Sequence, residues 1–197
     1  MKRIAVLSIL LITTFSTACC GAPPTPGENT MPQNQTTSIT APTSSNGTFM
    51  LTSSEVKEGG ALPKEFTCDG VSATLPLSWK DAPEGTKSFA VIMHHVPGPG
   101  DTHWYWVVYN IPSNITGLEK NAAGVGTLGN NSVNGETQYA PPCSKGPGEK
   151  VYTYTVYALS AEPQLSIPAS EVTRDVLLEA IQDITLASAA LNVTYTC

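Results

Sequence analysis

Three histidines lie close together in the middle of the 197-residue chain, at His94, His95 and His103. Imidazole changes charge between about pH 5 and 8, and it can donate hydrogen bonds, transfer protons or bind metal ions. Neighbours on a strand point to opposite faces, so His94 and His95 cannot readily chelate one ion. Asp101 and His103 form only a weak pair, and no H-x-H or H-x₃-H spacing comes with a carboxylate. We therefore expect no metal site and no cofactor.

The first 18 residues have the pattern of a secretory signal. Lys2 and Arg3 form a charged start, and the apolar run Ile4–Phe15 is followed by small residues before Cys19. The run is too short to span a bilayer as a helix. Small residues directly before a cysteine resemble the bacterial lipobox, in which Cys19 would carry the lipid after cleavage. Ordinary cleavage after Ala18 is the alternative.

Residues 19–47 predict a flexible, lipid-anchored linker. They are rich in Pro, Thr, Ser, Asn and Gln, with almost no large apolar side chain. Such a stretch cannot bury enough surface to offset the entropy lost on ordering. We therefore expect a signal peptide over 1–18, a tether over 19–47 and one globular domain over 48–197. The domain would be secreted across the inner membrane and held in the cell envelope, in the periplasm or on the outer surface.

The composition limits the partners of this domain. Only 13% of the residues are charged, and 16 Gly and 16 Pro accompany a 41% hydrophobic content, which favours a β-rich domain with long loops. The formal net charge is -6, and it becomes -8 when the two positive charges of Lys2 and Arg3 are removed. This acidity argues against nucleic acid and against anionic bilayers as docking surfaces. An anion-binding pocket would have to be local.

Several segments of the domain predict strands. The runs 89–93 and 104–109 are apolar on both faces, which is typical of strands covered on both sides. The run 151–159 is rich in aromatic and β-branched residues, and 187–195 alternates like a half-exposed strand. One helix is expected after Ser170 as its N-cap, with an apolar stripe from Val172 to Ile181. The long Gly-, Asn- and Pro-rich region 112–150 is a candidate functional loop. The expected fold is mainly β and antiparallel, with one or two late helices.

Three blocks of sequence, in order, resemble the phosphatidylethanolamine-binding protein family, which includes bacterial Raf-kinase-inhibitor-like proteins of the YbhB/YbcL type. The first block combines Phe66–Gly70 (FTCDG), LPLSW at 75–79 and APEGTKSF at 82–89. The second combines His94–Gly98 (HHVPG) and Thr102–Pro112 (THWYWVVYNIP). The third combines YAPPC at 139–143, KGPG at 145–148 and YTYTVYAL at 152–159. The resemblance covers nearly all of the chain from Phe49 onward. It implies an antiparallel β-sandwich with peripheral C-terminal helices and a small anion pocket at one end.

The family builds this pocket from an Asp-Pro-Asp-x-Pro loop, two histidines and a tyrosine. Here HHVPG replaces that loop, so that His94 stands in the position of the first acid. Without gaps Tyr105 occupies the position of the first pocket histidine, whereas a two-residue shift places His103 there. Lys150 takes the position of the second histidine, and Tyr152 matches the family tyrosine.

The resemblance therefore implies a ligand-binding set whose members supply imidazole, phenol or ammonium donors: His94, His95, His103, Tyr105, Lys150 and Tyr152. Charge-assisted hydrogen bonds would favour phosphate or carboxylate in such a set. On a strand, at most one of His94 and His95 can face a given pocket. Protonation of that histidine near about pH 6 would strengthen anion binding as the pH falls.

The resemblance also implies a disulfide between Cys68 and Cys143, because the family brings these two loops together beside its pocket. Thiols tend to pair in an oxidising compartment. The bridge would close a loop of about 75 residues and stabilise the domain by several kcal/mol. It would also remove Cys143 as a nucleophile. The partners of Cys20 and Cys197 cannot be assigned from the sequence.

The function expected from these residues is non-catalytic binding of a small anion or phospholipid headgroup, with a protein partner docked over the pocket as a further possibility. Membrane contact would come through the N-terminal lipid. The first alternative is a hydrolase with a Cys/His site around Cys143, which requires a free thiolate near an imidazole. The second is a protein-interaction module, such as a protease inhibitor, that uses the region 112–150 and has no small-molecule ligand.

Overall fold

The computed structural model describes residues 47–143 and 146–196. The expected signal peptide (1–18), the expected lipidation site Cys19 and all but the last residue of the expected linker lie outside the described residues. Cys197 also lies outside them.

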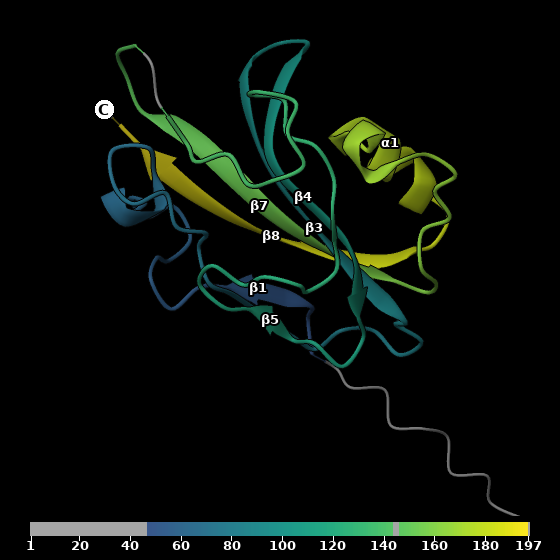
Figure 1. The fold of residues 1–197 in the computed structure, drawn as a ribbon. Helices are drawn as coiled ribbons and strands as arrows, with labels where there is room; N and C mark the ends of the chain where they lie inside the picture. Colours follow the sequence, from purple (N-terminus) through teal and green to yellow (C-terminus); the bar gives the residue numbers. More distant parts are fainter. Residues whose placement is uncertain (1–46, 144–145, 197) are drawn as a thin grey trace, which may run out of the picture. The chain divides into compact units, whose positions relative to one another are not determined.

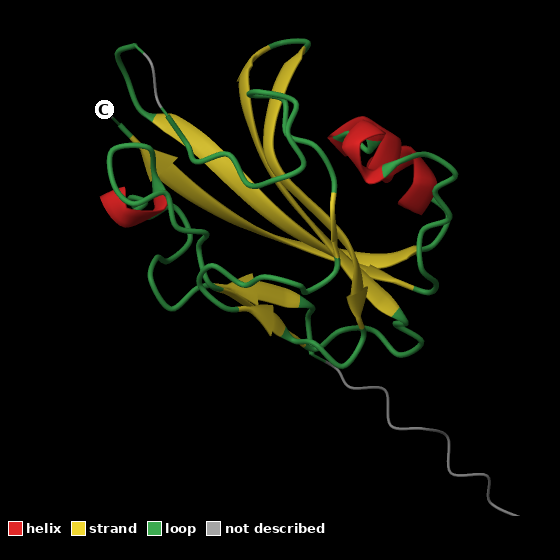
Figure 2. Ribbon diagram, in the orientation of Figure 1, coloured by secondary structure: helices red, strands yellow, loops and turns green. Residues whose placement is uncertain are grey.

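Antiparallel strands dominate the described part of the chain, as Figure 2 shows. The larger sheet has the order β6-β4-β3-β7-β8. Its strands are β3 Ser88–Gly98, β4 Asp101–Pro112, β6 Thr127–Leu128, β7 Lys150–Leu159 and β8 Thr185–Tyr195. The smaller sheet has the order β1-β2-β5, with β1 Met50–Thr52, β2 Leu77–Lys80 and β5 Gly117–Leu118.

Both faces of the larger sheet are covered. Phe89, Val91 and Met93 of β3 belong to the core shared with the smaller sheet. Ala90 and Ile92 point the other way and belong to a second core with the helix α1, Arg174–Ile181. Figure 1 shows β1 and β5 on one side of the larger sheet and α1 on the other. This double coverage explains why the sequence of β3 is apolar at consecutive positions.

The strands expected from the sequence are confirmed, and the expected β-sandwich is present. Alternation in β8 also follows the expected pattern, because Leu191, Val193 and Tyr195 are buried on the core side. The long region 112–150 contains two short strands, β5 and β6, between its loops.

The predicted start of the late helix is wrong. Ser170 lies inside a short 3-10 helix, η2 (Ala169–Glu171), and Val172 is extended. The N-cap is Thr173, whose hydroxyl accepts a hydrogen bond from the Val176 N–H at 3.1 Å. Threonine satisfies one of the free amides of the first turn as serine would, so both residues fitted the sequence pattern. A second 3-10 helix, η1, spans Lys64–Phe66.

Phe89 joins the two sheets and provides a test of this packing. Its ring centroid lies 6.2 Å from that of Phe49 and 5.3 Å from that of Trp79. We expect Phe89→Ala to lower the free energy of unfolding by about 3–5 kcal/mol, measured by chemical denaturation. Val71→Ala is the matched control, because Val71 is 77% exposed. A loss for Phe89→Ala no larger than the control's would contradict the assignment of this core.

Candidate functional site

A cleft of about 600 Å³ lies at the end of the larger sheet where β3 ends and β7 begins. Side chains from β3, β4 and β7 meet there with two loops. Five of the six residues expected in the ligand-binding set line it: His95, His103, Tyr105, Lys150 and Tyr152. The other described lining residues are Cys68, Pro97, Ser132, Val133, Pro141 and Cys143. None of these eleven described residues is acidic.

His95 is fixed in the cleft by its neighbours on β7. Its Nδ1 lies 2.7 Å from the Val151 carbonyl oxygen, and its ring centroid lies 5.2 Å from that of Tyr152. A carbonyl oxygen only accepts hydrogen bonds, so Nδ1 carries the hydrogen. In the neutral ring Nε2 is therefore an acceptor, and only the protonated ring donates from both nitrogens. His95 can donate from Nε2 to an anion only after it takes up a proton.

Two tyrosines form the floor of the cleft. Tyr105 and Tyr152 are buried, their ring centroids lie 5.3 Å apart in an edge-on arrangement, and their phenols are hydrogen-bonded to each other. Burial raises the pKa of Tyr105, and the Tyr152 hydrogen bond opposes that rise. A phenol is already neutral near pH 7, and the raised pKa widens the pH range over which Tyr105 keeps its hydrogen.

His103 lies directly across from His95 in the β3–β4 pairing. Its Nε2 is 3.3 Å from a carboxylate oxygen of Asp101, and both side chains are at least half exposed. The adjacent backbone of β4 is tied to the long loop, because the Trp104 N–H donates to the Ser132 hydroxyl at 2.9 Å. This hydrogen bond places Ser132 and Val133 in the wall of the cleft.

Lys150, the first residue of β7, supplies the ammonium group of the cleft. It is half-buried and takes part in none of the ion pairs formed among the described residues. A lysine without a carboxylate partner is available to a ligand anion.

A disulfide between Cys68 and Cys143 closes the remaining side of the cleft. The Cys68 N–H donates to the Pro142 carbonyl at 3.0 Å, and the Tyr139 hydroxyl donates to the Phe66 carbonyl at 3.0 Å. The pairing implied by the sequence resemblance is thus present. A Cys143 thiolate, which the hydrolase alternative requires, is not available while this bond is intact.

His94 is not among the residues that line the cleft, so its expected place in the ligand-binding set stays a prediction without support from this geometry. Successive side chains of β3 alternate, so His94 points to the face that packs against α1, while His95 points to the cleft. Burial lowers the pKa of His94, and the positive charges of Arg174 and His95 lower it further. Its buried Nδ1 has no hydrogen-bond partner among the described residues.

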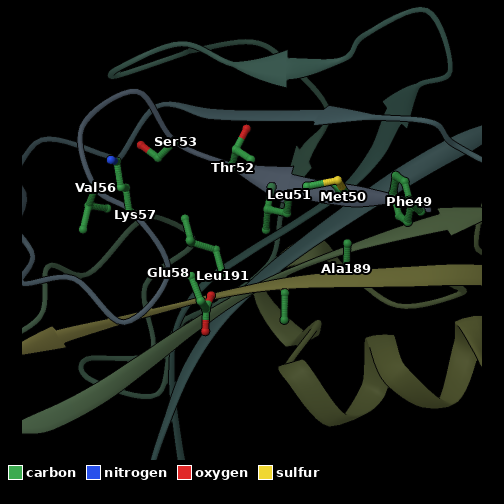
Figure 3. A pocket seen from close by; sticks show the side chains of 11 residues that line it. Phe49, Met50, Leu51, Thr52, Ser53, Val56, Lys57, Glu58, Ala189 and Leu191 are labelled. Carbon is green, nitrogen blue, oxygen red and sulfur yellow. The ribbon is translucent and has the colours of Figure 1, made fainter. Parts of the chain in front are cut away.

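A second hollow, of about 440 Å³, runs between β1 and β8. Figure 3 shows Phe49, Met50 and Leu51 of the β1 segment on one side and Ala189 and Leu191 of β8 on the other. Lys57 and Glu58 supply opposite charges at one end, as the same view shows. This groove is mainly apolar and lacks convergent donors, so it is a poorer candidate for an anion.

The sequence did not single out every residue of the cleft. Ser132 and Val133 were covered only by the expectation that the region 112–150 is functional, and no local motif marks them. Among the described residues, no group of three or more His, Cys, Asp and Glu side chains is placed to hold a metal ion. The described part of the chain contains no helix long and apolar enough to cross a membrane.

Comparison with known proteins gives the same family over most of the chain. A family described as "Phosphatidylethanolamine-binding protein" matches residues 52–196. A "UPF0098 protein" of Aquifex aeolicus is 37% identical over 69% of this chain and 82% of its own length. The protein LppC of Mycobacterium tuberculosis, whose name describes it as a candidate lipoprotein, is 27% identical over 72% of this chain and 71% of its own length.

Solved structures agree with the fold. A phosphatidylethanolamine-binding protein homologue, CT736 of Chlamydia trachomatis, has a TM-score of 0.68 and 31% identity, and the match covers 76% of this chain and 97% of that one. YbcL of Escherichia coli has a TM-score of 0.68 and 27% identity, covering 76% of this chain and 98% of its own.

The lowered pKa of His94 predicts a loss of stability in acid. At pH values between the ordinary histidine pKa of 6.5 and the lower pKa of His94 in the folded protein, His94 binds a proton in the unfolded chain but not in the folded one. The free energy of unfolding therefore has its full value above the ordinary pKa and decreases as the pH falls toward the lower pKa of folded His94. We expect His94→Gln to reduce the acid-induced decrease in unfolding free energy. Equal slopes in wild type and His94→Gln would contradict the placement of His94.

Proposed function

The chain belongs to the phosphatidylethanolamine-binding protein family, and from that membership we propose that its cleft binds a small phosphate-like anion without transforming it. The supporting observation is the convergence of five donor-bearing side chains on one cleft whose described lining has no carboxylate. The phosphate-bearing headgroup of a phospholipid and a free phosphate share the chemistry that this cleft would recognise.

The donors of the cleft suit a tetrahedral anion. Lys150 contributes a positive charge, and the buried Tyr105–Tyr152 pair can donate one phenol hydrogen, because the other is used between the two phenols. Hydrogen bonds from charged donors to phosphate oxygens are shorter and stronger than those between neutral groups. The overall charge of -6 opposes anion approach, so binding depends on this local group of donors.

Protonation of His95 would add a donor for the anion. Its Nδ1 hydrogen is committed to the Val151 carbonyl, so Nε2 can donate to an anion only in the protonated ring. The charged or titratable side chains near His95 are those of His94, His103, Lys150 and Tyr152. The Asp101 carboxylate contacts His103. The anion is therefore expected to bind more tightly as the pH falls.

Titration of the full chain with sulfate, inorganic phosphate and phosphorylethanolamine tests this proposal. Calorimetry at about pH 5.5 and about pH 7.5 should show tighter binding at the lower pH, where imidazole is charged. Sulfate keeps its charge over this range, so its pH dependence reports on the protein. Lys150→Gln should weaken binding by roughly tenfold or more, since a hydrogen bond to a charged group contributes about 1.5–3 kcal/mol.

Lys80→Gln is the matched control, because Lys80 is an exposed lysine on the smaller sheet. It should bind like wild type. Tighter binding of phosphorylethanolamine than of phosphate would favour the headgroup, and the reverse would favour free phosphate. Absence of binding at both pH values would contradict an anion site and direct the search to a protein partner over the cleft.

We further propose that the protein is anchored in the bacterial cell envelope through a lipid on Cys19. The sequence before Cys19 supports this, as does the similarity to LppC. The tether 19–47 would separate the cleft from the bilayer surface.

Substitution of the anchor residue tests this location. We expect Cys19→Ser to abolish incorporation of labelled fatty acid and to release the protein from the membrane fraction, because two or more acyl chains are needed for stable anchoring. Cys20→Ser is the matched control and should leave both unchanged. Membrane retention of a fully labelled Cys19→Ser protein would refute the assignment.

A further inference from the structure

We propose that the Cys68–Cys143 disulfide makes the cleft a site of thiol–disulfide exchange with small anionic thiols. The proposal rests on the proposed function, because the same donors would hold the negative group of the thiol. It adds a covalent chemistry to a cleft otherwise proposed only to bind.

The disulfide is part of the cleft lining and is accessible from it. Cys143 is exposed and Cys68 is half-buried, and both share the cleft with His95, His103 and Lys150. Because Cys143 is the more exposed of the two residues, we expect an incoming thiolate to attack its sulfur. The backbone around Cys68 stays in place through its amide hydrogen bond to Pro142.

The exchange step is balanced without another reagent. The thiolate sulfur of the small molecule attacks Cys143 Sγ and forms a new S–S bond there, while the Cys68–Cys143 bond breaks and its electron pair leaves on Cys68 Sγ. The leaving thiolate is stabilised by nearby positive charge. In the reverse step Cys68 attacks Cys143 Sγ, restores the original disulfide and expels the small thiolate.

Charge distinguishes this site from an ordinary surface disulfide. A protein with a formal charge of -6 repels anionic thiols as a whole, so an unassisted disulfide would react faster with a cationic thiol. The cleft reverses this preference locally through Lys150, whose ammonium has no carboxylate partner among the described residues. Of the nearby acids, Asp101 contacts His103, Asp69 accepts a hydrogen bond from Tyr195, and Glu149 is exposed beside Lys150 in the chain.

Three small thiols of similar size provide the test: mercaptoacetate, 2-mercaptoethanol and cysteamine, which are anionic, neutral and cationic. The full chain is mixed with each at low ionic strength and quenched with a maleimide. Mass spectrometry then measures the adduct on the peptide containing Cys143 and the alkylation of Cys68. Rates are divided by the thiolate concentration of each reagent and by the rate of that thiolate with an uncharged small-molecule disulfide, because thiolate nucleophilicity also rises with the thiol pKa. We expect mercaptoacetate to exceed cysteamine by roughly tenfold, the low end of electrostatic steering.

Variants test whether the cleft is the cause. Lys150→Glu should reverse the preference, whereas Lys80→Glu, with the same change in net charge at a distant exposed site, should retain it. Salt at about 1 M should bring the ratio of the mercaptoacetate rate to the cysteamine rate in the wild type closer to one, because the Debye length falls to about 3 Å. A wild-type ratio at or below one, or adducts mainly on Cys68, would overturn the proposal.

Inorganic phosphate separates this proposal from the proposed function. If both hold, phosphate binds by calorimetry and slows mercaptoacetate more than 2-mercaptoethanol. If phosphate binds but the three thiolates react alike, the anion site stands and the exchange proposal is wrong. If phosphate does not bind while mercaptoacetate is still preferred, the exchange proposal stands and the phosphate site is wrong.

Discussion

Strand alternation at the end of β3 is the constraint on which the site depends. His94 and His95 are neighbours in the sequence, yet the pleat sends them to opposite faces of the larger sheet. His94 enters the face covered by α1, where burial and Arg174 hold its pKa low. His95 enters the cleft, where the Val151 carbonyl fixes its ring. A register shift of one residue would exchange these roles and remove the imidazole from the cleft.

The cleft combines a floor of paired strands with walls that are made of loops. β3, β4 and β7 supply its donors from a continuous hydrogen-bonded sheet, so the relative positions of His95, His103 and Tyr152 follow from strand register. The contacts that attach the walls include the Trp104–Ser132 hydrogen bond, the Ala140 N–H that donates to the Tyr105 carbonyl, and the Cys68–Cys143 disulfide. The disulfide closes one side of the cleft, and it also leaves Cys143 without the free thiolate that a nucleophile needs.

The sequence was sufficient for the sheet and for most of the cleft, because the runs at 89–93 and 151–159 are long, apolar and β-prone. The family resemblance supplied five residues that the structure brings together. The helix start was misplaced because Ser170 and Thr173 both have the chemistry of an N-cap, and only the extended Val172 distinguishes them. His94 was included because the sequence does not show which of two adjacent side chains faces a pocket. Ser132 depends on a contact across 28 residues, which no local pattern encodes.

The chain contains three histidines, and the structure divides them into two in the cleft and one outside it. Nuclear magnetic resonance of the three imidazole rings during titration with inorganic phosphate, at constant ionic strength and pH, therefore tests the central claim directly. We expect saturable shifts at His95 and His103 and a much smaller shift at His94, which lies outside the cleft but interacts electrostatically with His95. No shift at His95, or equal shifts at all three rings, would contradict an anion site in the cleft.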